Sequence, residues 1–262
     1  MSFMNRNQFK HIIIIGGQRC GTTYLLNLLK TSKQFLLTNK IFPEPKYFLK
    51  KNPSYRNYLK NHFNIQKNDN KMILVEKSTT YYENYNALKN INLILDNYYL
   101  ILILRDPIKR AISNYAMSFK NGFEVFDLNQ AFSREFNNER RTSINHISTD
   151  PQDYIGRSMY MQKIKNILEI IPKDRLIVIT SESIFKNPKI IFEVLQKKAL
   201  FDFHNGIDEK YFSKVSIEKI NSLSYDFNSL LNKDIHRELL DLFSQDKKFL
   251  IKNFNLDLTY WQ

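Results

Sequence analysis

The segment Ile12 to Leu29, IIIIGGQRCGTTYLLNLL, constrains the fold more than any other part of the chain. Its isoleucines form a short apolar run that is typical of a buried strand, glycines follow, and Thr22 begins a stretch with leucines at helical spacing. A strand that turns tightly into a helix directs several backbone N–H donors and the positive end of the helix dipole at one point. The segment therefore predicts an anion site between a strand and a helix.

The same segment departs from the common nucleotide-binding loop GxxxxGK[ST]. Gly16 and Gly21 bracket four residues as in that loop, but Thr22 stands in the lysine position and Thr23 follows it. In kinases and NTPases the loop lysine reaches the β- and γ-phosphates, and the next hydroxyl holds Mg²⁺. Here Arg19 is the cation inside the loop, which favours an anionic group that needs no metal. A tight turn with incidental glycines is the alternative.

Short apolar runs alternate with longer stretches of helical period along the chain. This alternation predicts an α/β fold, a P-loop-type three-layer sandwich with a central parallel sheet flanked by helices. Strands are expected at His11–Ile15, Met72–Val75, Tyr99–Leu104 and Leu176–Thr180. Helices are expected at 22–31, after Pro53, from Pro107 with Asp106 as N-cap, and near 234–252.

The length of 262 residues suits one large domain, which we expect over residues 1–262. A polar region at 121–150 is rich in Asn, Arg and Ser and contains an aromatic helix pattern. Such a region between core elements is typical of a lid or binding loop. We expect it to be an acceptor-binding insertion.

The net charge of +13, from 39 basic and 26 acidic residues, favours an anionic partner such as a nucleotide, a polyanionic glycan or a nucleic acid. The basic residues are spread along the chain, without zinc-finger spacing or an RNP-type aromatic motif, so we expect no nucleic acid partner. A generally basic, well-solvated surface is the alternative explanation of the charge.

The lone Cys20 excludes an intrachain disulfide framework and favours a reducing compartment. The five histidines lack ligand spacing, so we expect no metal site. The apolar runs are of strand length, far below the roughly 20 residues that cross a bilayer. We therefore expect a soluble, cytoplasmic protein, and the richness in Asn, Lys and Ile suggests a bacterial origin.

A second motif begins where the apolar run 100–104 ends. Arg105 follows the run directly and is expected at the carboxyl edge of the sheet, where open α/β folds bind ligands. Lys109, Arg110 and Ser113 are spaced so that they share a helix face. An arginine fork with a hydroxyl suits a second phosphate. The alternative for Arg105 is a structural ion pair.

The segments GGQRCGTTYL and LILILRDPIKRAISNY together resemble the 5′-phosphosulfate loop and the 3′-phosphate motif of sulfotransferases that use 3′-phosphoadenosine 5′-phosphosulfate (PAPS). Two further segments are similar to the carbohydrate branch, which includes heparan sulfate sulfotransferases. FPEPKYF resembles KE-x-x-[FY]F, and VEKSTTYY resembles EK-[ST]-P-x-Y-[FL]. The later stretch 156–188 resembles the family's helix, strand and E-D-L/dP segment, with Tyr160, Glu182 and Pro188 in place.

The resemblance implies transfer of the sulfuryl group of PAPS to an acceptor hydroxyl, without a metal and with 3′-phosphoadenosine 5′-phosphate (PAP) as product. Glu44 is the implied general base, and Lys77 and Arg19 are the implied cations at the transferring group. The cofactor-binding residues expected are Gly17, Gln18, Arg19, Cys20, Gly21, Thr22, Thr23, Arg105, Ser113, Tyr160 and, in the adenine loop, Lys219. The acceptor, a glycan or another hydroxyl-bearing molecule, is expected to contact Lys46, Tyr81, Tyr82, Arg140 and Arg141.

The chain departs from the branch pattern at three positions. Arg19 stands where lysine is frequent, Thr79 stands where proline is frequent, and Pro43 stands where a lysine directly precedes the glutamate. By position alone, Glu44 is also compatible with a solvent-facing loop carboxylate, and Lys77 with an exposed pair to its neighbour Glu76.

Two other classes of protein remain as alternatives. One is a P-loop kinase for a small molecule, against which the missing loop lysine argues. The other is a non-catalytic polyanion-binding protein, against which Glu44 and Lys77 argue in their motif context. The sequence does not specify the acceptor or the oligomeric state.

Overall fold

The structure is a computed structural model that describes residues 9–66, 72–139, 150–202, 206–217 and 230–261. The chain divides into two compact units, Met1–Ile103 with Lys165–Ile220 and Leu104–Ile164 with Asn221–Gln262. Each unit is described by itself below. The expectation of a single domain over residues 1–262 stays a prediction.

The first unit is built on a five-stranded sheet in the order β2-β3-β1-β4-β5. The pairs β1–β3, β1–β4 and β2–β3 are parallel. The strands are β1 (Lys10–Gly16), β2 (Phe35–Leu37), β3 (Ile73–Lys77), β4 (Tyr98–Leu104) and β5 (Leu176–Thr180). The sheet confirms the predicted α/β fold class, and β2 is a strand that the sequence did not predict.

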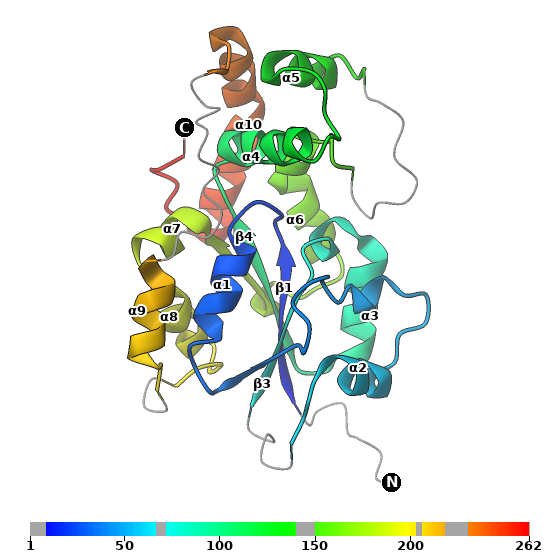
Figure 1. Cartoon of the computed structure of the whole chain (residues 1–262), viewed down its shortest axis with the longest axis vertical. Helices are drawn as coiled ribbons and strands as arrows, with labels where there is room; N and C mark the ends of the chain where they lie inside the picture. Colours follow the sequence, from blue (N-terminus) through cyan, green and yellow to red (C-terminus); the bar gives the residue numbers. More distant parts are fainter. Residues whose placement is uncertain (1–8, 67–71, 140–149, 203–205, 218–229, 262) are drawn as a thin grey trace. The chain divides into compact units, whose positions relative to one another are not determined.

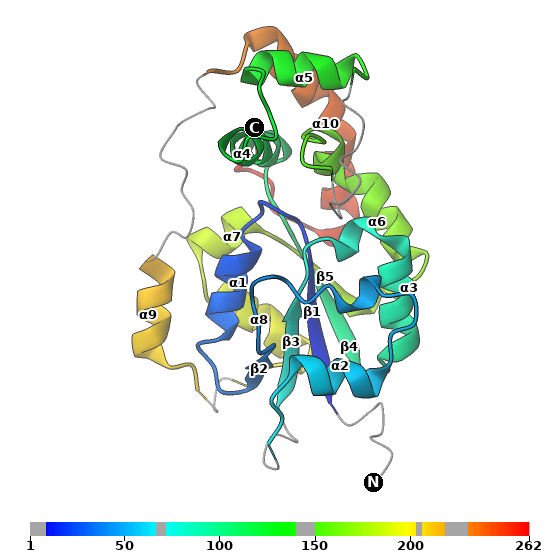
Figure 2. The same cartoon turned by 45° about the vertical axis from the view of Figure 1, so that its right-hand side comes forward.

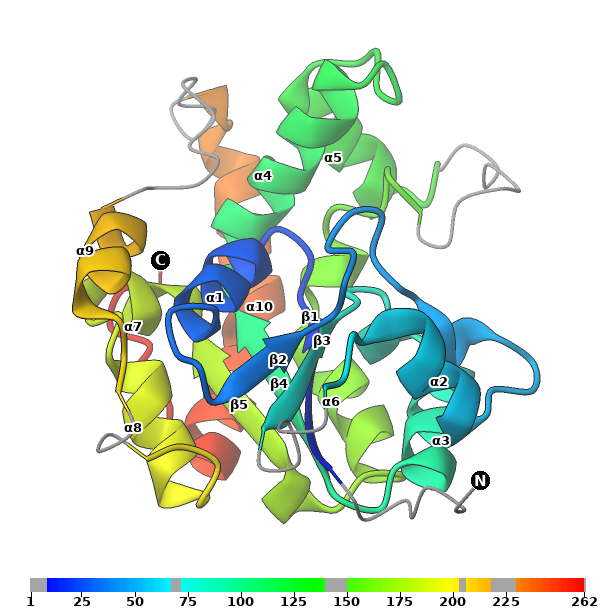
Figure 3. The ribbon, with the colours of Figure 1, turned by 60° about the horizontal axis from the view of Figure 1, so that its bottom comes forward.

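Helices cover both faces of this sheet, which gives the predicted three layers. Figures 1, 2 and 3 show α1, α8 and α9 along one face and α2 and α3 along the other. The helices of this unit are α1 (Thr22–Leu29), α2 (Tyr55–His62), α3 (Tyr85–Ile94), α7 (Ser181–Lys186), α8 (Ile190–Lys197) and α9 (Glu209–Ile217), with short 3-10 helices η1 (Tyr47–Leu49), η3 (Tyr81–Glu83) and η5 (Lys173–Arg175).

The apolar run of β1 is continuous because both faces of this strand are buried. Ile12 and Ile14 belong to one apolar cluster with Leu25 and Leu28 of α1. Side chains alternate along a strand, so Ile13 and its neighbours in the same phase point to the opposite face, where they are equally buried.

The loop that follows β1 begins between the ends of two neighbouring strands. β1 lies in the middle of the sheet, and the chain order reverses there, with β3 on one side and β4 on the other. The Gly17 N–H donates to the Ile103 carbonyl at 2.7 Å, and the Ser78 N–H donates to the Ile14 carbonyl at 3.0 Å. Such a switch point is where open α/β sheets bind ligands.

The second unit is mainly helical. Its helices are α4 (Pro107–Lys120), α5 (Leu128–Phe136), the 3-10 helix η4 (Gly156–Ser158) and α10 (Lys233–Phe254), and α6 (Tyr160–Leu168) begins in it. Figures 1 and 2 show α4, α5 and α10 grouped together, around a core that includes Ile108, Phe132 and Phe243. Asp106 caps α4 by accepting from the Lys109 N–H at 3.0 Å, which confirms the predicted N-cap.

Candidate active site

The turn between β1 and α1 presents a helix N-terminus without a side-chain cap. Gly21 occupies the N-cap position with φ of 86°, a left-handed conformation that favours glycine, and has no side chain to cap the helix. The first turn of α1 carries no acidic residue, so its positive end is not neutralised within the helix. These features suit the anion site predicted from the loop, which also holds Gly17, Gln18, Arg19, Cys20, Thr22 and Thr23.

The start of this turn is packed tightly against an aromatic ring. A Cβ atom added to Gly16 would lie 2.3 Å from Cδ1 of Tyr82, which is a severe overlap. Tyr82 is itself buried. Only glycine therefore fits at position 16 while the Tyr82 ring stays where it is.

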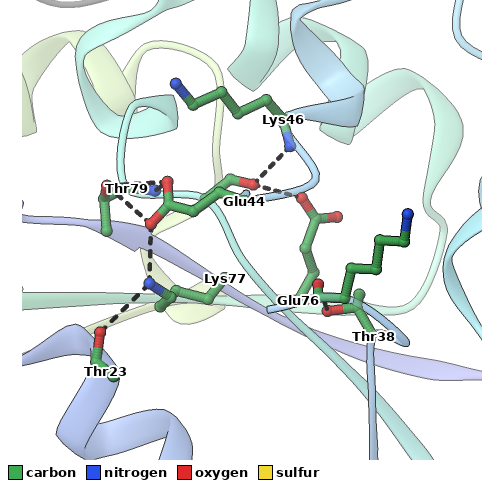
Figure 4. A network of polar contacts seen from close by, with 9 residues as sticks. Thr23, Thr38, Glu44, Lys46, Glu76, Lys77 and Thr79 are labelled. Atoms are coloured by element: carbon green, nitrogen blue, oxygen red, sulfur yellow. Dashed lines mark hydrogen bonds and ion pairs between the residues drawn. The ribbon is translucent and has the colours of Figure 1, made fainter. Parts of the chain in front are cut away.

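Lys77 and Glu44 form a close ion pair beside α1. The Lys77 Nζ atom lies 2.9 Å from the Glu44 Oε1 atom, and the two side chains are only 4% and 13% exposed (Figure 4). The same Nζ atom lies 3.5 Å from the Thr23 hydroxyl at the N-terminus of α1. Since charges separated from water interact more strongly than exposed ones, this pair is unlike an ordinary surface ion pair.

The partner of Lys77 follows from the alternation of side chains along β3. Val75 packs in the cluster that contains the α1 leucines, and Lys77 is two residues further in the same phase. Glu76 points to the opposite face of the sheet, so it is not the partner of Lys77. The sequence alternative of an exposed pair between these neighbours is wrong, because Glu76 is completely buried.

The Glu44 carboxylate is held by residue 79 as well as by Lys77. The Thr79 N–H donates to Oε2 at 2.9 Å, and the Thr79 hydroxyl lies 3.1 Å from both carboxylate oxygens (Figure 4). The Glu44 carboxylate is therefore held in one orientation by Lys77 and Thr79. The alternative of a solvent-facing loop residue is wrong.

Glu76 anchors the segment that follows Glu44. Its Oε1 atom accepts from the Ser78 hydroxyl at 2.8 Å and from the Tyr81 hydroxyl at 2.6 Å, and burial raises the pKa of this carboxyl group. The Ser78 hydroxyl accepts from the Lys46 N–H at 2.9 Å, and the Tyr81 hydroxyl accepts from the Phe48 N–H at 3.1 Å. The hydroxyl protons face the carboxylate, which leaves the oxygen lone pairs for the backbone.

An exposed aromatic ring lies next to the ion pair. Phe42 is 69% exposed, and the centre of its ring is 4.9 Å from the Lys77 Nζ atom. The contact has the distance of a cation–π interaction. Such a ring adds an apolar surface beside Glu44; Phe42 begins the segment FPEPKYF, but the sequence assigned it no role.

Arg105, Ser113 and Tyr160 lie in the second unit. The Tyr160 hydroxyl donates to the Arg105 carbonyl oxygen at 2.8 Å, while Arg105 and Ser113 are half-buried. Arg110, which the sequence placed on the same helix face, is fully buried and donates to the Tyr154 carbonyl at 3.0 Å. Arg110 therefore has a structural role inside the second unit.

The other predicted site residues are placed as follows. Tyr81 is buried with its hydroxyl engaged as described, and Lys46 is half-buried after Pro45. Within the described ranges, no group of three or more His, Cys, Asp or Glu side chains has a metal-binding arrangement. No helix in the described part of the chain is long and apolar enough to cross a membrane. Three predicted residues lie outside the described ranges: Arg140, Arg141 and Lys219.

Comparison with known proteins identifies the family of the chain. The family model described as "Sulfotransferase domain" matches residues 9–241, so the chain belongs to the sulfotransferase family. No curated protein sequence matches the chain.

The fold is also similar to that of a solved sulfotransferase. A sulfotransferase from Alicyclobacillus acidocaldarius superposes with a TM-score of 0.66 at 16% identity, over 96% of this chain and 98% of that chain. The sulfotransferase domain of the curacin biosynthetic pathway has a TM-score of 0.48 at 16% identity, over 92% and 99% of the two chains. The sulfotransferase domain from the Synechococcus PCC 7002 olefin synthase has a TM-score of 0.48 at 13% identity, over 93% of this chain and 97% of that chain.

Proposed function

We propose that the chain transfers the sulfuryl group of PAPS to a hydroxyl group of a carbohydrate acceptor, with Glu44 as the general base. The observation that carries this proposal is the ion pair of Glu44 with the buried Lys77, whose ammonium group lies beside the N-terminus of α1. A carboxylate and a cation are thus adjacent at the place where the loop favours an anion.

The residues of the turn suit the 5′-phosphosulfate of the donor. Backbone N–H groups of the loop and of the first turn of α1, together with Arg19 and Thr23, would bind its oxygens. Arg105 and Ser113 would bind the 3′-phosphate, which distinguishes this donor from ATP. Sulfate carries less charge than phosphate, so the transfer depends less on neutralisation by a metal.

The transfer itself is an in-line displacement. The acceptor oxygen forms a bond to sulfur while its proton passes to Glu44, and the bond from sulfur to the 5′-phosphate oxygen breaks, so that PAP leaves with the electron pair. A positioned general base is worth roughly 10²–10⁴-fold in rate. Lys77 and the loop amides stabilise the charge on the sulfuryl and bridging oxygens.

A carbohydrate acceptor is supported by the surface beside the pair. The exposed Phe42 ring offers an apolar face on which the C–H face of a sugar ring packs, and the net charge of +13 suits an anionic glycan. We propose Lys46 as a residue near the acceptor, together with Arg140 and Arg141, whereas the buried Tyr82 and Tyr81 support the site from within. From the cysteine content we propose the cytoplasm as the compartment.

Donor binding tests the proposal by thermal unfolding. A ligand at one hundred times its dissociation constant stabilises a protein by about 2.7 kcal/mol. We expect PAP to raise the unfolding temperature, and we expect ATP with Mg²⁺ to leave it unchanged. Arg105→Ala is expected to weaken the effect of PAP, whereas the control Arg237→Ala, at an exposed arginine, is expected to retain it.

The same experiment separates the alternatives. Stabilisation by ATP with Mg²⁺ and not by PAP would establish the small-molecule kinase instead. Stabilisation by a sulfated polysaccharide, with no response to either nucleotide, would establish a polyanion-binding protein without transfer activity.

A further inference from the structure

The residue at position 79 differs from the pattern that the chain otherwise resembles. Proline, which is frequent there, has neither an N–H nor a hydroxyl group. Thr79 has both, and both are directed at the Glu44 carboxylate at 2.9 and 3.1 Å. The side chain is buried, so these hydrogen bonds form where little water competes for the carboxylate.

The hydrogen-bond donors around the Glu44 carboxylate leave one of its lone-pair sites unoccupied among the described residues. A carboxylate has about four lone-pair sites. The Lys77 ammonium occupies one on Oε1, the Thr79 N–H occupies one on Oε2, and the Thr79 hydroxyl lies equally far from the two oxygens. The remaining site is available for the acceptor hydroxyl, whose proton the carboxylate takes up.

Lys77 has a second task that conflicts with holding Glu44. Its Nζ atom already lies within 3.5 Å of Thr23 at the anion site of α1. When a sulfuryl group is bound there, the ammonium group is drawn toward the sulfuryl oxygens and shares its charge between these oxygens and the carboxylate. The ion pair between Lys77 and Glu44 therefore weakens during sulfuryl transfer, when the carboxylate must be oriented toward the acceptor hydroxyl.

We propose that Thr79 is the positioning residue that keeps the Glu44 carboxylate oriented toward the acceptor when Lys77 engages the sulfuryl group. This inference rests on the proposed function, in which Glu44 is the base. Thr79 touches neither donor nor acceptor in this account, and it acts only through Glu44. A merely structural role, in which Thr79 satisfies its own buried hydroxyl group, is the competing explanation.

Substitutions at Thr79 and at its neighbour separate the two explanations. Thr79→Val keeps the shape but removes the hydroxyl, Thr79→Ser keeps the hydroxyl, and Thr80→Val is the matched control. Thr80 is equally buried, and its hydroxyl has no hydrogen-bond partner among the described residues. Release of PAP from PAPS is measured with water and with one fixed mixture of soluble oligosaccharides as acceptors.

We expect Thr79→Val to lower kcat roughly tenfold, because a hydrogen bond to a charged group is lost. Binding of PAP, followed by thermal unfolding, is expected to change less than twofold, since Thr79 does not contact the loop 17–23 in this account. Thr79→Ser is expected to restore kcat to within threefold of the wild type, and Thr80→Val is expected to stay within twofold.

The Glu44→Gln background tests whether Thr79 acts through Glu44. Residues that act as one unit give non-additive effects, so Thr79→Val is expected to cause no further loss in that background. Normal kcat in Thr79→Val, or an equal loss in both backgrounds, would overturn the inference. If Thr79→Val does not fold, the pair Thr79→Ala and Thr79→Ser gives the same comparison.

The outcomes also separate this inference from the proposed function. Full activity of Glu44→Gln would show that Glu44 is not the general base, and this result would also overturn the proposal for Thr79. Loss of activity in Glu44→Gln with full activity in Thr79→Val would overturn the role of Thr79 alone.

Discussion

At the scale of single residues, the site depends on positions where one atom decides the fit. Gly16 is such a position, because a Cβ atom there would overlap the ring of Tyr82. Tyr82 is buried, so its ring cannot turn into solvent without uncovering apolar surface. The loop that carries the anion site therefore begins at a contact that excludes every larger residue.

We predict that Gly16→Ala destabilises the protein by roughly 1–3 kcal/mol, the range for overpacking of a core. The free energy of unfolding in urea measures this cost. In a Tyr82→Leu background the added methyl group has more space, so the same substitution is expected to cost less. An equal cost in both backgrounds would contradict the proposed overlap as its cause.

The sequence indicated candidate residues for the site but did not indicate the contacts between them. Glu44 and Lys77 were found from motifs, but their mutual pairing was not, because the partner of a side chain depends on which segments the fold brings together. Thr79 attracted attention only as a departure from the pattern. The hydroxyl residues 78–80, which follow β3, were the only hint in the sequence of these hydrogen bonds. Their partners lie in a segment more than thirty residues away along the chain.

At the scale of elements, the end of β3 supports the segment 42–48. Glu76 accepts hydrogen bonds from the Ser78 and Tyr81 hydroxyl groups. These hydroxyl oxygens in turn accept hydrogen bonds from the backbone N–H groups of residues 46 and 48. Two segments distant in sequence are thereby fixed to each other next to Glu44. The network satisfies Oε1 of Glu76, whereas the buried Oε2 atom has no hydrogen-bond partner among the described residues.

We predict that Tyr81→Phe destabilises the protein by about 1–3 kcal/mol, because the buried Phe48 N–H loses its acceptor. Tyr85→Phe is the control, since Tyr85 is 46% exposed and such surface changes usually stay within about 0.5 kcal/mol. Urea unfolding of the two variants gives the comparison. Equal stabilities of Tyr81→Phe and the control would show that the network contributes nothing.

The strands were predictable to different degrees. β1 and β4 were predictable because both faces of these strands are buried, which makes their apolar runs continuous. β5 was predicted with the bounds that it has in the structure. β2 was missed, because Phe35–Leu37 is a three-residue edge strand with two half-buried side chains, too short for a periodic pattern. Lys77 was expected beyond the strand end but lies within β3, which is why its side chain points at α1.

At the scale of the whole molecule, buried titratable groups make stability depend on pH. Glu135 in α5 accepts from backbone N–H groups of Tyr154, Ile155 and Gly156 at 2.9–3.0 Å. Burial nevertheless raises the pKa of Glu135 to about 7, since loss of hydration outweighs these hydrogen bonds. His11 shows the opposite case, because burial lowers its pKa to about 3.

The sign of the Glu135 effect follows from proton binding. Between pH 4.5, the ordinary pKa of a glutamate, and pH 7 the folded protein keeps the proton that the unfolded chain has released. This contribution to stability is therefore complete below pH 4.5 and is lost as the pH rises to about 7. His11 acts in the opposite sense from pH 6.5 down to about 3, so the wild-type profile contains both effects.

We predict that the difference in unfolding free energy between the wild type and Glu135→Gln changes with pH, by an amount on the order of 1–3 kcal/mol. The wild type is expected to lose stability relative to the variant from pH 4.5 to pH 7, with no further change above. His11 is present in both proteins and cancels in the difference. A difference that stays constant over this range would contradict the raised pKa.

The rate of sulfuryl transfer from PAPS, compared between the wild type and Glu44→Gln, tests the central claim most directly. A panel of carbohydrate, lipid-linked and phenolic acceptors with labelled donor serves both proteins. We predict transfer by the wild type and a loss of at least about 10²-fold in Glu44→Gln, with stabilisation by PAP nearly unchanged. Equal rates of transfer by the two proteins would contradict the account.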